Sequence, residues 1–344
     1  MIEPTSRCHL ACPMCARTAK GTTRKDLVLR ELSKEDLEHI FETSFVNQLR
    51  QVQLNGNFGE PVASSQTLWF CEYLKKRKVP AIEVFTSGSL RTPDWWRELG
   101  GLLNQNNDLV RFSIDGLEDT NGIYRVNSNF EKIIDNAKTF IKAGGVAQWE
   151  FIVFDHNQHQ IEKARDLARS LGFSGFAVKR SRRNKDNLKY KLTQTVNSNT
   201  RFADEEKYHR KYKNWSEYLK ITPITCKYVD LSKIFIDFFG DLWPCTWFGF
   251  TPLAEPSSAF RSQTESLYQK YGRGFNSVLK NSLPEVLEHP WFNEELEDSW
   301  KAPGHRQCKR FDICSQLCGD AYEHTSGPGK NYKVERFNVP SSKK

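Results

Sequence analysis

Residues 81–116, AIEVFTSGSLRTPDWWRELGGLLNQNNDLVRFSIDG, predict one strand–helix–strand unit. AIEVFTS (81–87) and LVRFSID (109–115) are short and rich in Val, Ile and Phe, which is typical of strands. Between them, TPDWWRELGGLL (92–103) has apolar residues at helical spacing, and Thr92 suits the N-cap. Two strands joined through a helix are expected to lie parallel in one sheet.

The same alternation continues on both sides of this unit. Further strands are predicted at 52–58, 149–155 and 176–180. Further helices are predicted within 33–45, 65–77, 129–145 and 158–173, with Ser33 as an N-cap and Gly144-Gly145 as a stop. The pattern predicts the α/β class, with a parallel sheet and helices packed on its faces.

The polar and cysteine-rich motifs follow the predicted strands, where parallel barrels place their chemistry. In chain order they are Cys8 to Cys15, Gly59-Glu60, Ser87-Gly88 and Asp115-Gly116. Because each motif follows a different strand, we expect them to meet at one edge of the sheet.

The composition is that of a globular protein. Of the 344 residues, 38% are apolar and 27% are charged, and no apolar run approaches the roughly 18 residues of a membrane helix. The start, MIEPTSRCHLACPMC, lacks the basic and apolar regions of a signal peptide. We therefore expect a cytoplasmic protein with no membrane partner. The net charge of +8 suits an anionic partner and a solvated surface equally.

Nine cysteines indicate metal or redox chemistry, since grouped thiols in a cytoplasmic chain rarely form disulfides. Cys8, Cys12 and Cys15 stand together, whereas Cys71 is isolated in a helical pattern and is expected to be buried. Three thiolates of one loop can bind three irons of a [4Fe–4S] cluster and leave the fourth iron open. A structural zinc site is the alternative, but His9 follows Cys8 directly and would have to bend back to become the fourth ligand.

The segment IEPTSRCHLACPMC resembles the first strand and cluster loop of the radical S-adenosylmethionine (SAM) superfamily. The resemblance covers about residues 1–180 and implies a partial (β/α)6 TIM-like barrel. It also implies that Cys8, Cys12 and Cys15 hold a catalytic [4Fe–4S] cluster whose open iron binds SAM. Met1 stands only seven residues before Cys8, so the first strand is expected to be very short.

The resemblance implies SAM contacts in the cluster loop and after the second strand. In GNFGEP (56–61), Gly59 and Glu60 match the glycine and the acid that hold the SAM ammonium group. Phe58 replaces the other glycine of that motif. Met14 matches the residue whose neighbourhood contacts the adenine.

Further SAM contacts are implied after the third and fourth strands. Ser87, in FTSGSL, stands where related enzymes have asparagine. Ser113, in SIDG, and Arg125, in YRVNSNF, match residues that bind the ribose and the SAM carboxylate. Asp115 either helps to hold substrate or ribose, or forms an Asp-Gly turn.

The spacing of the later cysteines resembles the SPASM and twitch extensions of such enzymes; these residues are Cys226, Cys245, Cys308, Cys314 and Cys318. Two cysteine-ligated auxiliary clusters need eight thiolates, so five allow one auxiliary [4Fe–4S] cluster. The resemblance implies Cys226, Cys245 and Cys318 as ligands, with Cys308 or Cys314 as the fourth. The alternatives are a zinc site of His305 with the last three cysteines, and a degenerate domain in which some thiols are merely buried.

Three parts of the chain are predicted. Residues 1–180 form the radical SAM core, 181–222 a basic polar linker or loop, and 223–344 a small α+β, SPASM/twitch-like domain. In the last part, KIFIDFFGDLWPC (233–245) predicts a β-hairpin that turns near Gly240-Asp241. The linker is a solvated connector or a surface for an acidic peptide or a phosphate-bearing substrate.

The resemblance implies an enzyme, of oxidoreductase or peptide-modifying type, that cleaves SAM to a 5′-deoxyadenosyl radical and takes a hydrogen atom from its substrate. By analogy with maturases that carry SPASM-type extensions, the substrate is a peptide or protein, and the electron donor is a flavodoxin or ferredoxin. One alternative is a dehydrogenase or epimerase of a sugar or cofactor precursor. The other is a nucleic-acid-associated iron–sulfur or zinc protein that uses the basic segment 179–213, but the chain has no recognised RNA-binding motif.

Overall fold

The structure is a computed structural model that describes residues 1–19, 22–105, 107–179, 211–255, 257–301, 310–320 and 332–337. The chain divides into two compact units. One consists of residues 2–198 and 325–344, and the other of Met1 and residues 199–324. Among the described helices, none combines the length and the apolar character needed to cross a bilayer.

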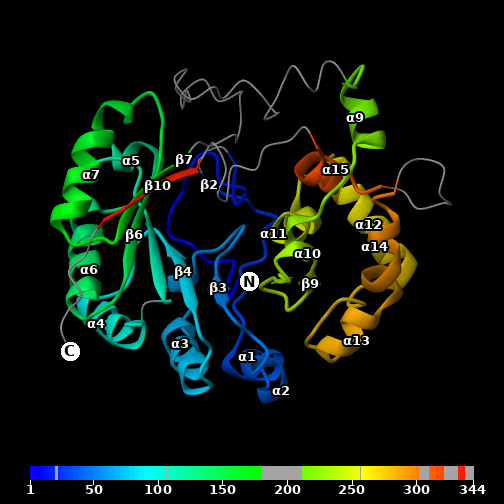
Figure 1. Ribbon diagram of the computed structural model, residues 1–344, viewed down its shortest axis with the longest axis horizontal. Helices are drawn as coiled ribbons and strands as arrows, with labels where there is room; N and C mark the ends of the chain where they lie inside the picture. The colour runs from blue at the N-terminus through cyan, green and yellow to red at the C-terminus, as the bar shows by residue number, and fades with distance from the viewer. Residues whose placement is uncertain are drawn as a thin grey trace. The chain divides into compact units, whose positions relative to one another are not determined.

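The N-terminal unit is built on a six-stranded sheet with the order β10-β7-β6-β5-β4-β3 (Figure 1). Its strands are β3 Val52–Leu54, β4 Ile82–Thr86, β5 Leu109–Ser113, β6 Ala147–Ile152, β7 Gly175–Lys179 and β10 Tyr332–Arg336. Strands β3 to β7 run parallel, whereas β10 runs antiparallel to β7. The predicted α/β class and the parallel sheet are confirmed.

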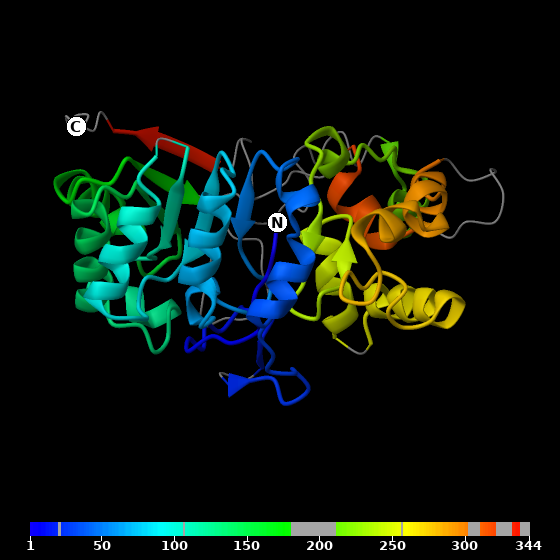
Figure 2. The ribbon, with the colours of Figure 1, turned by 90° about the horizontal axis from the view of Figure 1, so that it is seen from below.

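Helices connect the parallel strands, and α3, α4, α6 and α7 cover one face of the sheet (Figures 1 and 2). The helices are α1 Lys34–Ile40, α2 Thr43–Val46, α3 Thr67–Lys76, α4 Pro93–Leu102, α5 Asn121–Tyr124, α6 Phe130–Lys142 and α7 Ile161–Ser170. Short elements are the hairpin β1 Thr18–Ala19 and β2 Thr22–Thr23 and the 3-10 turns η1 Pro61–Ala63 and η2 Gln158–Gln160.

The local predictions for these helices hold. Ser33 and Thr92 are N-caps whose hydroxyls accept backbone N–H groups. Gly144 follows α6 with a φ of +100°, a conformation that favours glycine. Cys71 lies on α3 and is fully buried.

At one edge the sheet agrees with the sequence-based prediction of a very short first strand, and at the other it differs. The first strand is reduced to a single parallel bridge between Ile2 and Leu54, because Pro4 has no N–H to extend a ladder. Residues 332–336, which the sequence places in the C-terminal domain, form β10 in the N-terminal unit. There they cover the open edge of β7, whose unpaired N–H and C=O groups need a partner.

The C-terminal unit consists of helices around one small hairpin. Its elements are α9 Trp215–Ile221, α10 Lys227–Asp230, β8 Phe235–Ile236, β9 Leu242–Trp243, α11 Thr246–Phe250, η3 Thr251–Leu253, α12 Ala259–Tyr271, α13 Leu283–Glu288, the π-helix η4 Trp291–Glu295, α14 Leu296–Asp298 and α15 Asp312–Cys318. Strands β8 and β9 are antiparallel, which confirms the predicted hairpin. The aromatic core of this unit includes Trp243, Phe248 and Trp291, and Cys245 and Cys314 pack against it.

Candidate cluster and SAM site

The loop of residues 8–15 lies across the ends of the parallel strands. The Glu60 N–H, after β3, donates to the Arg7 carbonyl at 2.9 Å. The Ala11 N–H donates at 3.1 Å to the carbonyl of Val126, which follows β5. These bonds hold the loop at the carboxyl end of the sheet, where barrel enzymes have their active sites.

The three thiols of this loop share one apolar cluster. Its buried members are Leu10, Cys12, Met14, Tyr124 and Phe154, and Cys8 and Cys15 pack against them. The Leu10 N–H points at the Cys8 sulfur at 3.4 Å. Burial raises the pKa of Cys8 to about 12 and that of Cys12 to about 11, so a bound cation is needed to stabilise their thiolates. Iron supplies that charge, and the donor set fits a cluster.

The His9 ring lies beside Cys8 and Glu60. The Cys8 sulfur, a His9 ring nitrogen and a Glu60 oxygen all lie within 4.8 Å of one another. Both nitrogens of His9 are buried without a hydrogen-bond partner, and burial lowers the pKa of the ring. A single metal ion on this trio would leave Cys12 and Cys15 unused, so the trio explains the loop less completely than a cluster does.

Glu60 is held by the end of β4. One carboxylate oxygen accepts the Thr86 hydroxyl at 2.6 Å and the Ser87 N–H at 2.9 Å. The other accepts the Ser87 hydroxyl at 2.7 Å and lies 3.9 Å from the Cys8 sulfur. Glu60 is 6% exposed, and the His9 ring interacts electrostatically with its carboxylate. Its charge beside the cluster loop suits the ammonium group of SAM.

The loop before Glu60 also depends on Glu3 and Arg17, which the sequence analysis did not single out. A Cβ on Gly59 would stand 1.6 Å from the Thr5 carbonyl oxygen, so only glycine fits there. Phe58, which replaces the other glycine, is buried, and its N–H donates to Glu3 at 2.7 Å. The buried Arg17 donates to the Phe58 carbonyl at 2.9 Å. The signals available in the sequence were the acid Glu3 and the basic Arg17, among mostly uncharged residues around the three cysteines.

Glu3 gives this loop a predicted pH dependence. Its carboxylate accepts the N–H groups of Phe58 and Gly59 at 2.7 and 2.8 Å, while its other oxygen is buried without a partner. Burial raises the pKa of Glu3 from 4.5 to about 7. The folded chain therefore binds a proton more tightly than the unfolded chain, and this contribution to stability is lost as pH rises from 4.5 through 7.

Glu3→Gln should remove this loss, because the amide keeps an acceptor oxygen and cannot ionise. The free energy of unfolding of the variant, minus that of the wild type, should rise by up to ~3 kcal/mol between pH 5 and pH 8. Urea unfolding of both proteins across this pH range measures the difference. Parallel stability curves for the two proteins would contradict the assignment.

Arg125 is held in place by an ion pair with Asp115. Its Nε donates to Asp115 at 2.6 Å, and the Asp115 side chain is fully buried. The other Asp115 oxygen accepts the Ile152 N–H at 2.7 Å. Burial opposes the charge of Arg125, but Asp115 and Cys12 together raise its pKa above the ordinary value. Arg125 thus links the end of β5 to a cluster-loop thiol, and Asp115 does more than form a turn.

The structure brings most of the predicted SAM residues together in two groups. Glu60 and Ser87 meet beside Cys8, and Arg125 meets Cys12. Ser113 ends β5 and is half-buried, with no side-chain hydrogen bond to either group among the described residues. Met14 is buried in the apolar cluster of the loop.

Four cysteines of the C-terminal unit line one apolar cavity. They are Cys226, Cys245, Cys314 and Cys318, and their neighbours include Tyr228, Trp247, Leu296, Trp300, Ile313 and Leu317. A hydrogen bond from Cys318 lowers the pKa of Cys226 to about 6. Burial raises the pKa of Cys245 to about 12. Cys308 and His305, the other residues considered for this site, lie outside the described residues.

The spacing of the described sulfurs can be compared with that of a zinc site. Zn–S bonds of about 2.3 Å in a tetrahedron hold the sulfurs roughly 3.8 Å apart. In the part of the chain that the structure describes, only the Cys8, His9 and Glu60 ligand atoms all lie within 4.8 Å of one another. Among the described cysteines, no three sulfurs meet that limit. The zinc site of His305 with Cys308, Cys314 and Cys318 lies partly outside the described residues and stays untested.

Comparisons with known proteins agree with this arrangement. The sequence profile of the Radical SAM superfamily matches residues 2–168. Streptococcus suis SuiB, solved with bound S-adenosylmethionine, is 16% identical, with a TM-score of 0.56 over 91% of this chain and 71% of its own. The structure of anSMEcpe with bound AdoMet is also 16% identical, with a TM-score of 0.54 over 91% of this chain and 87% of its own.

At these identities the structural likeness concerns the fold, and no curated protein matches the chain in sequence. The profile match covers the cluster loop, Glu60, Ser87, Ser113 and Arg125 within one domain. The parallel sheet and the loop across its carboxyl end are what that match predicts. Residues 2–168 thus form a radical SAM domain, the domain whose family model they match.

Proposed function

We propose that this radical SAM enzyme modifies a peptide or protein and uses one auxiliary [4Fe–4S] cluster in its C-terminal unit. The observation that carries the proposal is the cavity lined by Cys226, Cys245, Cys314 and Cys318. A second cysteine site in addition to the SAM site suits a net oxidation or a cross-link, since such reactions must dispose of an electron after hydrogen abstraction.

In the N-terminal unit, Cys8, Cys12 and Cys15 would hold the catalytic cluster and leave one iron for SAM. When bound there, the cluster supplies one electron for reductive cleavage of SAM to a 5′-deoxyadenosyl radical. Glu60 would accept the SAM ammonium, and its bonds to Thr86 and Ser87 fix the carboxylate before SAM arrives.

The other residues of the site would orient SAM and exclude water. Arg125 would attract the SAM carboxylate, while its bond to Asp115 fixes the direction of the guanidinium. Ser113 would bind the ribose from the end of β5. Met14 would contact the adenine, and the apolar cluster around it keeps water from the thiols.

The four cysteines of the second cavity are enough to occupy all four irons of an auxiliary cluster. A cluster with no open iron transfers electrons rather than binding substrate. The apolar neighbours of these thiols limit solvent access, as expected for an electron-transfer site. Cys314 thereby takes the fourth position that the sequence left open between Cys308 and Cys314.

The proposed substrate class is supported by the peptide complexes of the structural neighbours. SuiB has been solved with the precursor peptide SuiA, at 16% identity and a TM-score of 0.53. The anSMEcpe protein has been solved with AdoMet and the Cp18Cys peptide, at 17% identity and a TM-score of 0.54.

Removing two auxiliary thiols should halve the iron content without removing the catalytic cluster. We expect about eight irons per chain in the anaerobically reconstituted wild type and about four in the Cys245→Ala/Cys314→Ala variant. The variant should still form 5′-deoxyadenosine from SAM with dithionite. Cys71→Ala, which removes a buried thiol outside both sites, is the matched control and should keep eight. Zinc in place of the lost iron, or eight irons in the double variant, would overturn the assignment.

The substrate class is tested by the origin of the abstracted hydrogen. Wild type, SAM and dithionite are incubated with peptides from deuterated cells and, separately, with deuterated sugars and nucleotides. Mass spectrometry of the 5′-deoxyadenosine should show deuterium in the peptide reaction. Deuterium from the small-molecule mixture alone would refute the peptide proposal.

A further inference from the structure

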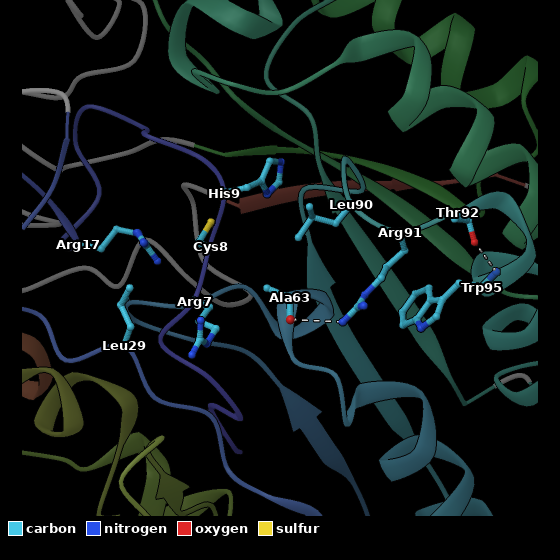
Figure 3. Close-up of a pocket in the computed structure, with 10 residues that line it drawn as sticks. All are labelled: Arg7, Cys8, His9, Arg17, Leu29, Ala63, Leu90, Arg91, Thr92 and Trp95. Atoms are coloured by element: carbon cyan, nitrogen blue, oxygen red, sulfur yellow. Dashed lines mark hydrogen bonds between the residues drawn. The ribbon is translucent and has the colours of Figure 1, made fainter.

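The two cysteine sites differ in the groups that line the cavities beside them. The cavity next to Cys8 is lined by three arginines, Arg7, Arg17 and Arg91, and by no acid (Figure 3). The cavity of the C-terminal unit has four thiols, and none of the described residues that line it is a lysine, arginine or histidine. Because no cation lines this second cavity, N–H dipoles are the groups of the chain that can stabilise its thiolates.

Three of the four thiols in the C-terminal unit face N–H groups of the backbone. The Phe248 N–H donates to the Cys245 sulfur at 3.3 Å. Backbone N–H groups of residues 227–229 donate to the sulfurs of Cys226 and Cys318. Each of these N–H groups favours the thiolate over the thiol. They belong to the main chain, so a substitution at their positions leaves them in place.

Cys314 differs from the other three because its donor is a side chain. Trp300 lines the same cavity, and its indole Nε1 is buried with no nitrogen or oxygen acceptor among the described residues. Burial raises the pKa of the Cys314 thiol, and the Trp300 indole N–H opposes that rise. A buried N–H without an acceptor is costly, so the sulfur of Cys314 is the acceptor that Trp300 requires.

The position of Trp300 is fixed by contacts other than the one with Cys314. Its backbone N–H donates to the Glu297 carbonyl at 3.0 Å. Its own carbonyl accepts a guanidinium N–H of Arg310 at 2.9 Å, and the same Arg310 nitrogen donates to the Thr222 carbonyl at 2.6 Å. The Trp300 ring packs against the aromatic core of the unit. The indole N–H is therefore in place before any cluster binds.

We propose that Trp300 tunes the auxiliary site: its indole N–H donates to the Cys314 sulfur and raises the reduction potential of the cluster that the four cysteines hold. The inference rests on the proposed function, because it requires the auxiliary cluster. Hydrogen bonds to the sulfurs stabilise the reduced state, which carries the greater negative charge. Trp300 thereby makes the auxiliary site a better electron acceptor, and its own proton stays on the indole nitrogen.

Two matched substitutions test this role. Trp300→Phe removes the indole N–H and keeps an apolar aromatic ring in the cavity. The control is Trp247→Phe, which makes the same change at another tryptophan that lines the cavity. The Trp247 group that acts on Cys245 is its backbone N–H, which phenylalanine retains. The control should therefore keep the potential of the wild type.

The measurements use the full chain with Cys8, Cys12 and Cys15 changed to alanine, so that only the auxiliary cluster contributes a signal. Electron paramagnetic resonance at controlled potentials gives the midpoint potential. Trp300→Phe should lower the equilibrium constant for reduction by about tenfold, which is roughly 59 mV for a one-electron couple. With Trp300 intact and tryptophan labelled with heavy nitrogen at the indole, pulsed resonance should detect that nitrogen coupled to the reduced cluster. The coupling should disappear in Trp300→Phe.

The outcomes separate the role of Trp300 from the proposed function. An unchanged potential in Trp300→Phe refutes the inference and leaves the auxiliary cluster in place. An equal fall in Trp247→Phe refutes it also, because the effect then follows the loss of any indole from the cavity. If Trp300→Phe binds no iron, the labelled protein still decides, since absence of the indole coupling with Trp300 intact contradicts the hydrogen bond. Absence of a cluster in the chain that keeps both tryptophans overturns the proposed function itself.

Discussion

Changing Cys8, Cys12 and Cys15 together to alanine should reduce SAM cleavage to the level of a protein-free control. The three thiols come from one loop, and that loop is held across the carboxyl ends of the strands by backbone bonds on both sides. Removing the ligands leaves the backbone and its anchors in place. We expect about four of roughly eight irons to be lost, because the four thiols of the C-terminal unit are untouched.

Iron and sulfide analysis with chromatography of 5′-deoxyadenosine provides both readouts from one sample. Circular dichroism checks that the triple variant is folded, and Cys71→Ala controls for the loss of a buried thiol. SAM cleavage by a folded triple variant would show that these cysteines do not hold the catalytic cluster. Loss of all iron would show that the two cysteine groups do not bind clusters independently.

The sequence predicted the parallel sheet because its strands are short apolar segments separated by helices with clear signals. Ser33 and Thr92 begin helices because their hydroxyls accept backbone N–H groups, and Gly144 ends one because it can adopt a positive φ. These properties belong to the residues themselves, so a single sequence is enough to place them. The hairpin β8–β9 was predictable for the same reason, with Gly240 at a φ of +81° in its turn. Such signals depend on residues that are close together in the sequence, so they can be recognised without knowing the fold.

Contacts between distant residues could not be predicted in this way. Strand β10 pairs with β7 across more than 150 positions of sequence, and no local pattern names its partner. The contacts of Glu3 with Phe58 and of Arg17 with the Phe58 carbonyl are equally remote. His9 was considered only as the fourth ligand of a zinc site with the three cysteines, whereas its ring lies near Cys8 and Glu60, a trio that spacing in the sequence does not reveal.

The candidate site follows the same division. The spacing of Cys8, Cys12 and Cys15 and the resemblance of GNFGEP were enough to name candidate cluster ligands and a candidate acid for SAM. They did not reveal that Thr86 and Ser87 fix the carboxylate of Glu60, because those bonds join two strand ends. Spacing also left Cys308 and Cys314 as equal candidates for the auxiliary site; Cys314 lines the same cavity as the other three thiols, and Cys308 lies outside the described residues.

Asp115→Ala should destabilise the N-terminal unit by about 3–5 kcal/mol, the cost of leaving a buried charge without its partner. The Asp115 side chain is fully buried, and that of Arg125 is 16% exposed. The variant also leaves the Ile152 N–H, which donates to Asp115 at 2.7 Å, without an acceptor. Asp115→Asn should cost less, because the amide oxygen can still accept one of these two donors.

The matched control for this variant is Asp94→Ala, which removes an aspartate from an exposed pair with Arg97. There the Asp94 side chain is 86% exposed, so the loss should stay below about 1 kcal/mol. Urea unfolding measures the global change, and hydrogen exchange at the Ile152 amide reports the local one. Asp115→Ala should make that amide exchange faster even under conditions where the chain remains folded. Equal costs for the two alanine variants would mean that the buried pair contributes no more than a surface pair, and that Arg125 does not need Asp115 to hold its position beside Cys12.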